Sequence, residues 1–342
     1  MTALPPDPVL VEVTRGDMVE SRHRGACAVV DARGKVLFAT GDIAQPVYGR
    51  SALKPLQALP LIESGAAEHF ALGPREIALA CGSHRGEPMH VDAVAAWLAR
   101  LGLGADALEC GAHPPLGAAA AQALARAGEA PSALHNNCSG KHAGFLATAR
   151  HRGEPVRGYV AAEHPVQRRV LAALAEMTGA DLAAAPCGID GCGIPVVGLP
   201  LRAIARGMAR LADPVGLAPA RAAAALRIVA AMSTEPLMVA GTGSFTSMIM
   251  AAAPPLCLKP GAEGVFCAAL PGEGLGVALK IADGAGRAAE VAIGAILVRL
   301  GVLDQARQQQ LGVLLRPSVT NVAGRVVGEI RPASQGGEAA TP

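Results

Sequence analysis

Apolar and polar positions follow a strand-like pattern near both ends of the chain and a helix-like pattern between them. Short β-rich runs at residues 9–13, 26–30 and 36–39 predict strands, with a hairpin turn at 31–34 joining the last two. After residue 237, further runs predict strands at 245–250, 256–258, 265–270, 275–281 and 325–330, with a helix at 288–300 before the last.

Between residues 51 and 234 the chain is rich in Ala and Leu and is interrupted by Gly or Pro. Its apolar residues recur at helical spacing, which predicts a series of helices. The predicted helices cover residues 74–80, 89–101, 117–127, 141–151, 164–177, 200–211 and 219–232.

Strands at both ends with helices between them indicate an α/β protein of the α+β sandwich type, in which both ends share one sheet and a helical subdomain is inserted. At 342 residues the chain exceeds the usual size of a single core, so two lobes are expected. We assign 1–65 and 236–331 to a sheet lobe, 66–235 to a mainly helical lobe, and 332–342 to a disordered tail. Catalytic residues would meet in the cleft between the lobes.

Composition excludes several classes of function. The net charge is +2 and only three residues are Tyr or Trp, so there is no footprint for nucleic acid. The longest uncharged run, 236–258, contains a Gly-rich turn and Pro254-Pro255, which favours a buried strand over a membrane span. Residues 1–8 lack the features of a signal peptide, so we expect a cytoplasmic protein without a membrane partner.

The scarcity of lysine directs attention to particular positions. The chain contains 25 Arg but only five Lys: Lys35, Lys54, Lys141, Lys259 and Lys280. A desolvated lysine can lose its proton, whereas arginine cannot. We therefore expect some of these lysines to stand where a neutral amine is needed. The eight cysteines are expected to be thiols or metal ligands in a reducing compartment.

The first polar segment, residues 50–55, contains Ser51 and Lys54 three positions apart at a predicted helix start. This spacing puts both side chains on one face, where a desolvated amine can activate a hydroxyl. Alternatively, Ser51 is an ordinary N-cap and Lys54 a solvated residue of the first turn. The apolar residues that follow favour burial of this helix and a depressed lysine pKa.

Four further polar segments are candidates for chemistry. Residues 81–84 carry Ser83, and residues 136–142 precede a helix whose N-terminus could bind an anion or oxyanion. A tight turn at 188–195 carries one carboxylate and one thiol. In 279–284, Lys280 interrupts an apolar strand, although it could simply point outward from an edge.

Together these segments resemble the rhizobial-type L-asparaginase II family, also called class 3. The similarity runs from Val11 to Ile330, and its motifs occur in the same order. They read Arg50-Ser51-x-x-Lys54-Pro55, Cys81-x-Ser83-His84, Asn137-Cys138-Ser139-Gly140-Lys141-His142, Asp190-Gly191-Cys192, Met238-Val239-Ala240-Gly241-x-Gly243 and Lys280-Ile281-x-Asp283-Gly284. The resemblance implies a serine β-lactamase- and glutaminase-like fold with a helical lobe, and a homodimer.

The resemblance also implies roles for the site residues. Two Ser-Lys pairs would build the site, Ser51 with Lys54 and Ser83 with Lys280, and Ser51 would attack the side-chain amide of L-asparagine. A zinc ion would be bound by three residues: Cys138, Lys141 and Cys192. Asp190 would receive the substrate's ammonium group, and Arg50 or His142 its α-carboxylate. Ser244 stands where the family commonly has Arg, which affects the expected preference for asparagine.

Two alternatives remain at this point. A glutaminase or a serine β-lactamase-like amidohydrolase would share the fold and the Ser-x-x-Lys spacing. A non-catalytic amino-acid-binding protein would keep the pocket without needing two lysines that can become neutral. Release of ammonia from asparagine and glutamine, tested beside a cephalosporin, separates these functions.

Overall fold

A computed structural model describes residues 7–333 and contains one large antiparallel sheet. Its strands lie in the order β10-β11-β1-β2-β9-β8-β7, and β3 also pairs with β2. The strands are β1 (Val9–Arg15), β2 (Met18–Asp31), β3 (Val36–Thr40), β7 (Cys257–Pro260), β8 (Val265–Leu270), β9 (Leu275–Ile281), β10 (Ser318–Thr320) and β11 (Val326–Pro332). The predicted α+β class, with a sheet built from both ends of the chain, is confirmed.

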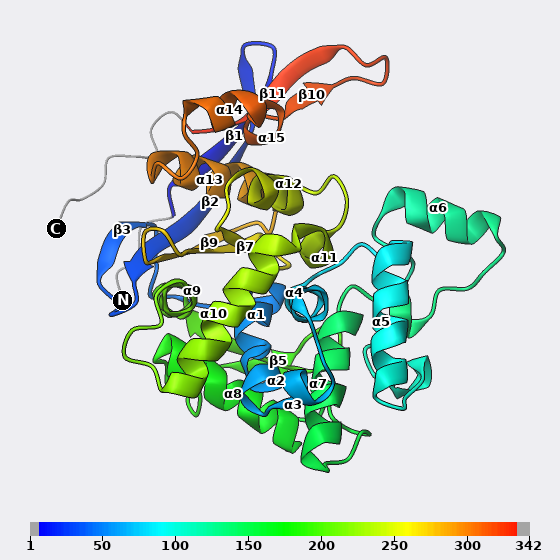
Figure 1. The fold of residues 1–342 in the computed structure, drawn as a ribbon. Helices are drawn as coiled ribbons and strands as arrows, with labels where there is room; N and C mark the ends of the chain where they lie inside the picture. Colours follow the sequence, from blue (N-terminus) through cyan, green and yellow to red (C-terminus); the bar gives the residue numbers. More distant parts are fainter. Residues whose placement is uncertain (1–6, 334–342) are drawn as a thin grey trace.

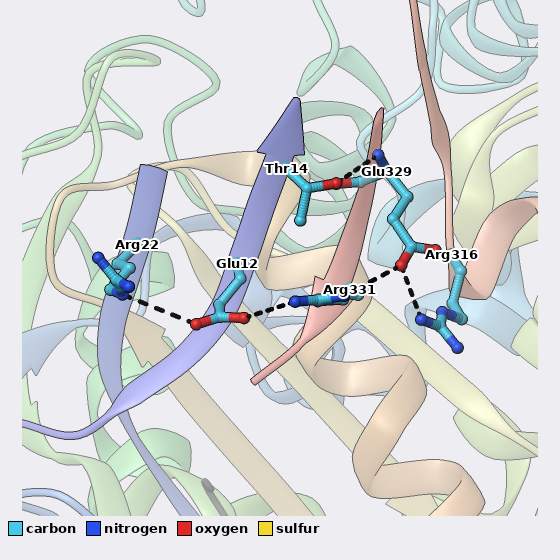
Figure 2. A network of polar contacts seen from close by, with 6 residues as sticks. All are labelled: Glu12, Thr14, Arg22, Arg316, Glu329 and Arg331. Atoms are coloured by element: carbon cyan, nitrogen blue, oxygen red, sulfur yellow. Dashed lines mark hydrogen bonds and ion pairs between the residues drawn. The ribbon is translucent and has the colours of Figure 1, made fainter. Parts of the chain in front are cut away.

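The two ends of the chain are joined through β1, which pairs with β2 on one side and β11 on the other. A row of alternating charges crosses these strands from Arg22 through Glu12 and Arg331 to Glu329 and Arg316 (Figure 2). The Arg22 and Arg316 side chains are more than half exposed, and those of Arg331 and Glu329 about one third, so solvent screens these ion pairs and they contribute little free energy. The buried apolar residues on the opposite side of β1 account for more of the stability.

Helices cover the sheet on both faces (Figure 1). Helix α9 (Leu201–Ala212) packs on β2, β8 and β9, and approaches so closely that a Cβ on Gly276 would lie 2.0 Å from the Ala205 carbonyl oxygen. Leu279 has the opposite parity on β9 and lies beside α13 (Gly286–Arg299). Lys259 and Cys267 are paired across β7 and β8, and Cys267 is paired with Ala278, so Lys259 shares the α9 side of the sheet.

Most of the remaining helices form a layer beyond α9, whereas the last two helices of the described chain lie beside α13 on the other face of the sheet (Figure 1). The helices before α9 are α1 (Lys54–Gln57), α2 (Leu59–Glu63), α3 (Ala66–His69), α4 (Pro74–Cys81), α5 (Pro88–Arg100), α6 (Ala118–Arg126), α7 (Ser139–Arg152) and α8 (Pro165–Thr178). After it come α10 (Pro219–Thr234), α11 (Pro236–Ala240), α12 (Phe245–Ala252), α14 (Gln305–Gln310) and α15 (Gly312–Leu315). The 3₁₀ helices are η1 (Arg50–Leu53), η2 (Ala105–Ala107) and η3 (Ala133–His135). All seven helices predicted between residues 51 and 234, and the one at 288–300, are confirmed to within a few residues.

The predicted strand at 245–250 is wrong, because this segment forms α12. The Ser244 side chain accepts a hydrogen bond from the Ser247 backbone N–H and caps the helix, and the preceding 236–240 stretch is also helical. A short continuous apolar run does not distinguish a buried strand from a buried helix. A small second sheet of β4 (Pro46–Tyr48), β6 (Pro195–Pro200) and β5 (Cys187–Ile189) was not predicted.

Other expectations about the organisation stay predictions. The helices α1 to α3 pack among α4, α7, α8 and α10, although α1 and α2 lie in the segment 1–65 that we assign to the sheet lobe. Conversely, α9 lies in the segment 66–235, which we assign to the helical lobe, but it packs on the sheet. Each predicted segment therefore contributes helices to both layers. Most of the predicted tail, and most of residues 1–8, where we expect no signal peptide, lie outside the described residues, although Pro332 belongs to β11. Within residues 7–333, no helix is long and apolar enough to cross a membrane. The homodimer stays a prediction.

Candidate active site

Ser51 lies in η1, directly after a residue in a strained conformation. Arg50 has a positive φ of 49°, which is uncommon for a residue with a side chain. Strain of this kind often accompanies functional sites, where the surrounding structure holds it in place. In a 3₁₀ turn, residues three apart eclipse each other, so Ser51 and Lys54 lie on the same side, as predicted.

Lys54 begins α1 and is fully buried. Its Nζ lies 2.6 Å from the Gly82 carbonyl oxygen, 3.0 Å from Ser83 Oγ and 3.2 Å from the Asn137 carbonyl oxygen. Among the described residues, no hydrogen bond joins Lys54 to the Ser51 hydroxyl. The Lys54 amine is therefore held beside the second serine while standing on the same helical face as the first.

Ser83 follows α4 and lies between two buried amines. Besides Lys54, the Nζ of Lys259 lies 2.8 Å from Ser83 Oγ and also donates to the Pro260 carbonyl oxygen at 2.9 Å. Lys259 comes from β7, which contacts η1. The sheet edge and the first helix thus bring two lysines to one hydroxyl.

The environment of these amines favours their neutral forms. Burial lowers the pKa of Lys54, although the nearby sulfurs of Cys138 and Cys192 oppose this effect. Burial, followed by the charge of Lys54, holds the pKa of Lys259 well below its usual value. Two ammonium groups cannot both remain charged beside one hydroxyl without a large cost, so the site favours at least one neutral amine that can accept a proton.

The predicted contact between Ser83 and Lys280 is wrong. Lys280 Nζ donates instead to the backbone carbonyls of Glu263, at 2.7 Å, and Ile281, at 2.6 Å. Lys280 lies on β9, two strands away from β7, near the end of its strand. At about 4.8 Å per strand, this position is roughly 10 Å across the sheet from that of Lys259.

Lys259 was not predicted as a site residue, although the sequence carried a usable signal. It is one of five lysines and ends the longest uncharged run, directly before Pro260-Gly261. The reasoning that selected Lys280, a scarce lysine interrupting an apolar strand before a turn, applies equally to Lys259. Both lysines have the same parity in the sheet, so strand position alone decides between them, and the sequence does not specify the order of strands.

The three residues expected to bind zinc lie together and are buried. Lys141 Nζ lies 2.9 Å from Cys192 Sγ. A hydrogen bond from the Cys192 thiol, reinforced by the amines of Lys54 and Lys141 against the effect of burial, holds the pKa of Cys138 well below its usual value. The same bond, together with burial, raises the pKa of Cys192.

The cluster of Cys138, Lys141 and Cys192 can offer three ligands to a metal ion only if the Lys141 amine is one of them. Within residues 7–333, no three side chains of His, Cys, Asp or Glu are arranged to hold a metal ion. Two sulfurs and one nitrogen do match the donor types that zinc accepts, and the low pKa of Cys138 supplies a thiolate. The residues therefore fit a zinc ion that keeps one position open.

The residues expected to bind the substrate's charged groups are placed differently from one another. Arg50 Nε donates to Asp190 Oδ1 at 2.8 Å, so these two predicted contacts form an ion pair. His142 is fully buried, and its Nδ1 lies 2.8 Å from the Tyr159 hydroxyl. Its Nε2 is buried and has no hydrogen-bond partner among residues 7–333. Arg50 directly precedes Ser51 in the sequence and holds Asp190 through this ion pair. No described contact joins His142 to either serine.

Comparison with known proteins identifies the family. The model of the L-asparaginase II family matches residues 11–332. No curated protein is significantly similar in sequence. Among solved structures, a β-lactamase from Mycobacterium bovis is 16% identical, with 80% of this chain and 94% of that chain covered and a TM-score of 0.40. Because the family match spans nearly all the described residues, this chain belongs to the L-asparaginase II family, a family of asparaginase-type amidohydrolases.

Proposed function

We propose that this protein is an L-asparaginase that hydrolyses L-asparagine to L-aspartate and ammonia by Ser-Lys catalysis. The observation that carries the proposal is the position of Ser83 Oγ, 3.0 Å from Lys54 Nζ and 2.8 Å from Lys259 Nζ, with both amines fully buried. An amino-acid-binding protein would gain nothing from two buried amines at one hydroxyl, because burying them costs free energy.

The chemistry follows from the two serines. Ser51 Oγ attacks the side-chain amide carbon, and its proton passes to the Lys54 amine, which Ser83 connects to Lys259. The proton then goes to the leaving nitrogen, so the C–N bond breaks and ammonia departs from an acyl-enzyme on Ser51. Water attacks this ester with the same amine as base, releasing aspartate and restoring the Ser51 hydroxyl.

Ser51 is the better candidate for the nucleophile because of its surroundings. Its hydroxyl has no hydrogen-bond partner among the described residues, whereas the Ser83 hydroxyl already contacts two amines. Ser51 also lies at the start of a helical segment, where free backbone N–H groups can stabilise an oxyanion. Ser83 is then the proton carrier between the lysines.

The substrate's charged groups fit the ion pair beside Ser51. The Arg50 guanidinium can bind an α-carboxylate, and the Asp190 carboxylate can bind an ammonium group. Their mutual bond in the free protein occupies one oxygen of Asp190, which also accepts from the Gly191 backbone N–H.

We also propose one zinc ion per chain, bound by Cys138, Lys141 and Cys192. When bound, the ion would supply positive charge and an open coordination position next to the site. Burial lowers the pKa of Lys141, but the sulfurs of Cys138 and Cys192 outweigh it and raise the pKa above its usual value. Binding therefore requires Lys141 to release a proton, which makes zinc affinity increase with pH.

Ser51→Ala tests the assignment of the nucleophile. We expect a loss of asparagine hydrolysis on the order of 10⁴-fold with an unchanged thermal midpoint, because no acyl-enzyme can form. Ammonia release from asparagine, glutamine and a cephalosporin, with mass spectrometry of the trapped acyl-enzyme, measures the effect. Activity above about a tenth of wild type, or acylation of Ser83, would assign the nucleophile to Ser83 instead.

A further inference from the structure

Two buried imidazoles lie directly beside Ser83 and belong to none of the groups that handle the substrate. His84 and His90 are both fully buried, and their rings stack with centroids 4.9 Å apart and planes 13° from parallel. His84 follows Ser83 in sequence, and His90 lies in the first turn of α5.

The hydrogen bonds of His84 specify its protonation state. The Gly86 backbone N–H donates to Nδ1 at 3.1 Å, so Nδ1 carries no proton. Nε2 lies 2.8 Å from Ser139 Oγ, and that hydroxyl donates its own proton to the Leu134 carbonyl oxygen at 3.0 Å. His84 must therefore donate from Nε2 to Ser139, as a neutral imidazole. Burial lowers its pKa well below the usual value, in agreement.

His90 has the same arrangement toward a different segment. Its Nδ1 accepts from the Glu87 backbone N–H at 3.2 Å, and its Nε2 donates to the Leu237 carbonyl oxygen at 2.9 Å. Leu237 belongs to α11, and two residues later the Val239 carbonyl oxygen accepts the Ser83 backbone N–H at 2.8 Å. The His90 ring thus fixes the same helix that holds the Ser83 backbone.

The two rings connect the three segments that meet at Ser83. His84 ties the Ser83 segment to the start of α7, where the Asn137 carbonyl oxygen accepts from Lys54. His90 ties the chain after Ser83 to α11. Because the rings stack and both are neutral, they form a rigid unit that adds no charge beside Lys54 and Lys259.

We propose that the stacked pair His84 and His90 is a positioning element that fixes Ser83 Oγ between the two lysines. The inference rests on the proposed function, because it assigns the rings a role in Ser-Lys catalysis. Neither ring touches the reacting atoms. A displacement of about 1 Å in such a site costs on the order of 100-fold in rate, so loss of the His84 bond should lower kcat more than it lowers substrate binding.

The test exploits the reach of two amide side chains. Asn at position 84 can accept from Gly86 but is too short to reach Ser139, whereas Gln places its amide near the position of Nε2. We expect His84→Asn to lower kcat for asparagine by about 10- to 100-fold with KM changed less than about threefold, and His84→Gln to recover most of the rate. Ser139→Ala, which removes the acceptor, should lower kcat to a similar extent.

A double-mutant cycle and a matched control complete the design. The variant His84→Asn/Ser139→Ala should be no slower than either single variant, because both remove the same bond. His164 is also buried, accepts from the Val166 backbone N–H at 3.2 Å and lies 3.0 Å from the Pro155 carbonyl oxygen, without contacting the site segments. His164→Asn should lower the thermal midpoint but leave kcat within about twofold of wild type.

The outcomes separate this inference from the proposed function. A wild-type protein that releases no ammonia from asparagine or glutamine overturns the proposed function and this inference with it. An active wild type with unchanged kcat in His84→Asn and Ser139→Ala overturns only the positioning role. Independent, multiplying losses in the double variant also refute it. If His84→Asn does not fold, as seen by circular dichroism, Ser139→Ala and His84→Gln decide the question.

Discussion

Two groups of buried lysines in this protein differ in the charge that their surroundings favour. Lys54 and Lys259 are fully buried around a hydroxyl, and burial lowers the pKa of both. Lys141 is also buried, but two cysteine sulfurs raise its pKa. The surroundings of the same side chain at the same depth thus favour the neutral amine in one cluster and the cation in the other. Burial alone does not assign a lysine's role, because its neighbours decide it.

Among variants of the two lysine groups, the largest expected effect comes from replacing the lysines beside Ser83. Lys54→Arg and Lys259→Arg should each lower kcat by on the order of 10³-fold, nearly as much as the corresponding change to Ala. A guanidinium keeps the charge but cannot accept the serine proton near neutral pH. Steady-state ammonia release by purified, folded variants measures the effect.

Lys280→Arg is the matched control for these variants. Within the described part of the chain, Lys280 donates hydrogen bonds only to backbone carbonyls, which a guanidinium can also do, so we expect activity within about threefold of wild type. Arg variants at Lys54 and Lys259 that keep most of the activity lost on change to Ala would show that these residues serve only as cations.

A smaller effect is expected from the sulfur cluster. Cys138→Ser/Cys192→Ser should remove the proposed zinc and raise KM for asparagine about tenfold, the loss expected when one interaction with a charged group disappears. Elemental analysis of freshly purified protein measures the metal, and kinetics with and without chelator measure its effect. Wild-type protein without zinc, together with full activity in chelator, would contradict the proposal and leave Lys141 paired with thiols alone.

The smallest expected effect is the pH dependence of the wild-type rate. Lys54 and Lys259 have pKa values below the ordinary 10.5, and only their neutral forms accept a proton. As pH rises toward the ordinary lysine value of 10.5, the neutral fraction grows, so kcat should increase by less than about tenfold and level off once the amine is neutral. A pH series of kcat in the stable range tests this, and a flat profile from 6 to 10 would exclude a lysine base.

The part of the site that lies close together in sequence could be predicted best. The spacing of Ser51 and Lys54 determines that they share a face, and Cys138 and Lys141, which we propose to bind zinc, lie three apart. The partner of Ser83 could not be found in this way, because Lys259 reaches it from a strand 176 residues later. That contact depends on β7 lying beside η1, which follows from the tertiary fold.

The fold was predictable wherever periodicity was unambiguous. The amphipathic helices from α4 to α10 and the strands β1, β2, β8 and β9 agree with the pattern. The error at α12 arose because its run is apolar on nearly every side, and the Ser244 cap was interpreted as part of a turn. The short strands β4, β5 and β6 carry too few residues to show alternation.

The pairing of β1 with β11 also has a consequence for synthesis of the protein. Residues of β1 leave the ribosome before those of β11, because their partners near Ile330 and Pro332 are made more than 300 residues later. Throughout elongation, β1 and β2 can form a hairpin whose outer edge has unpaired N–H and C=O groups. Such an edge invites pairing with another nascent chain. The charged residues along it, Glu12 and Arg15 among them, would oppose that association until the last strand arrives.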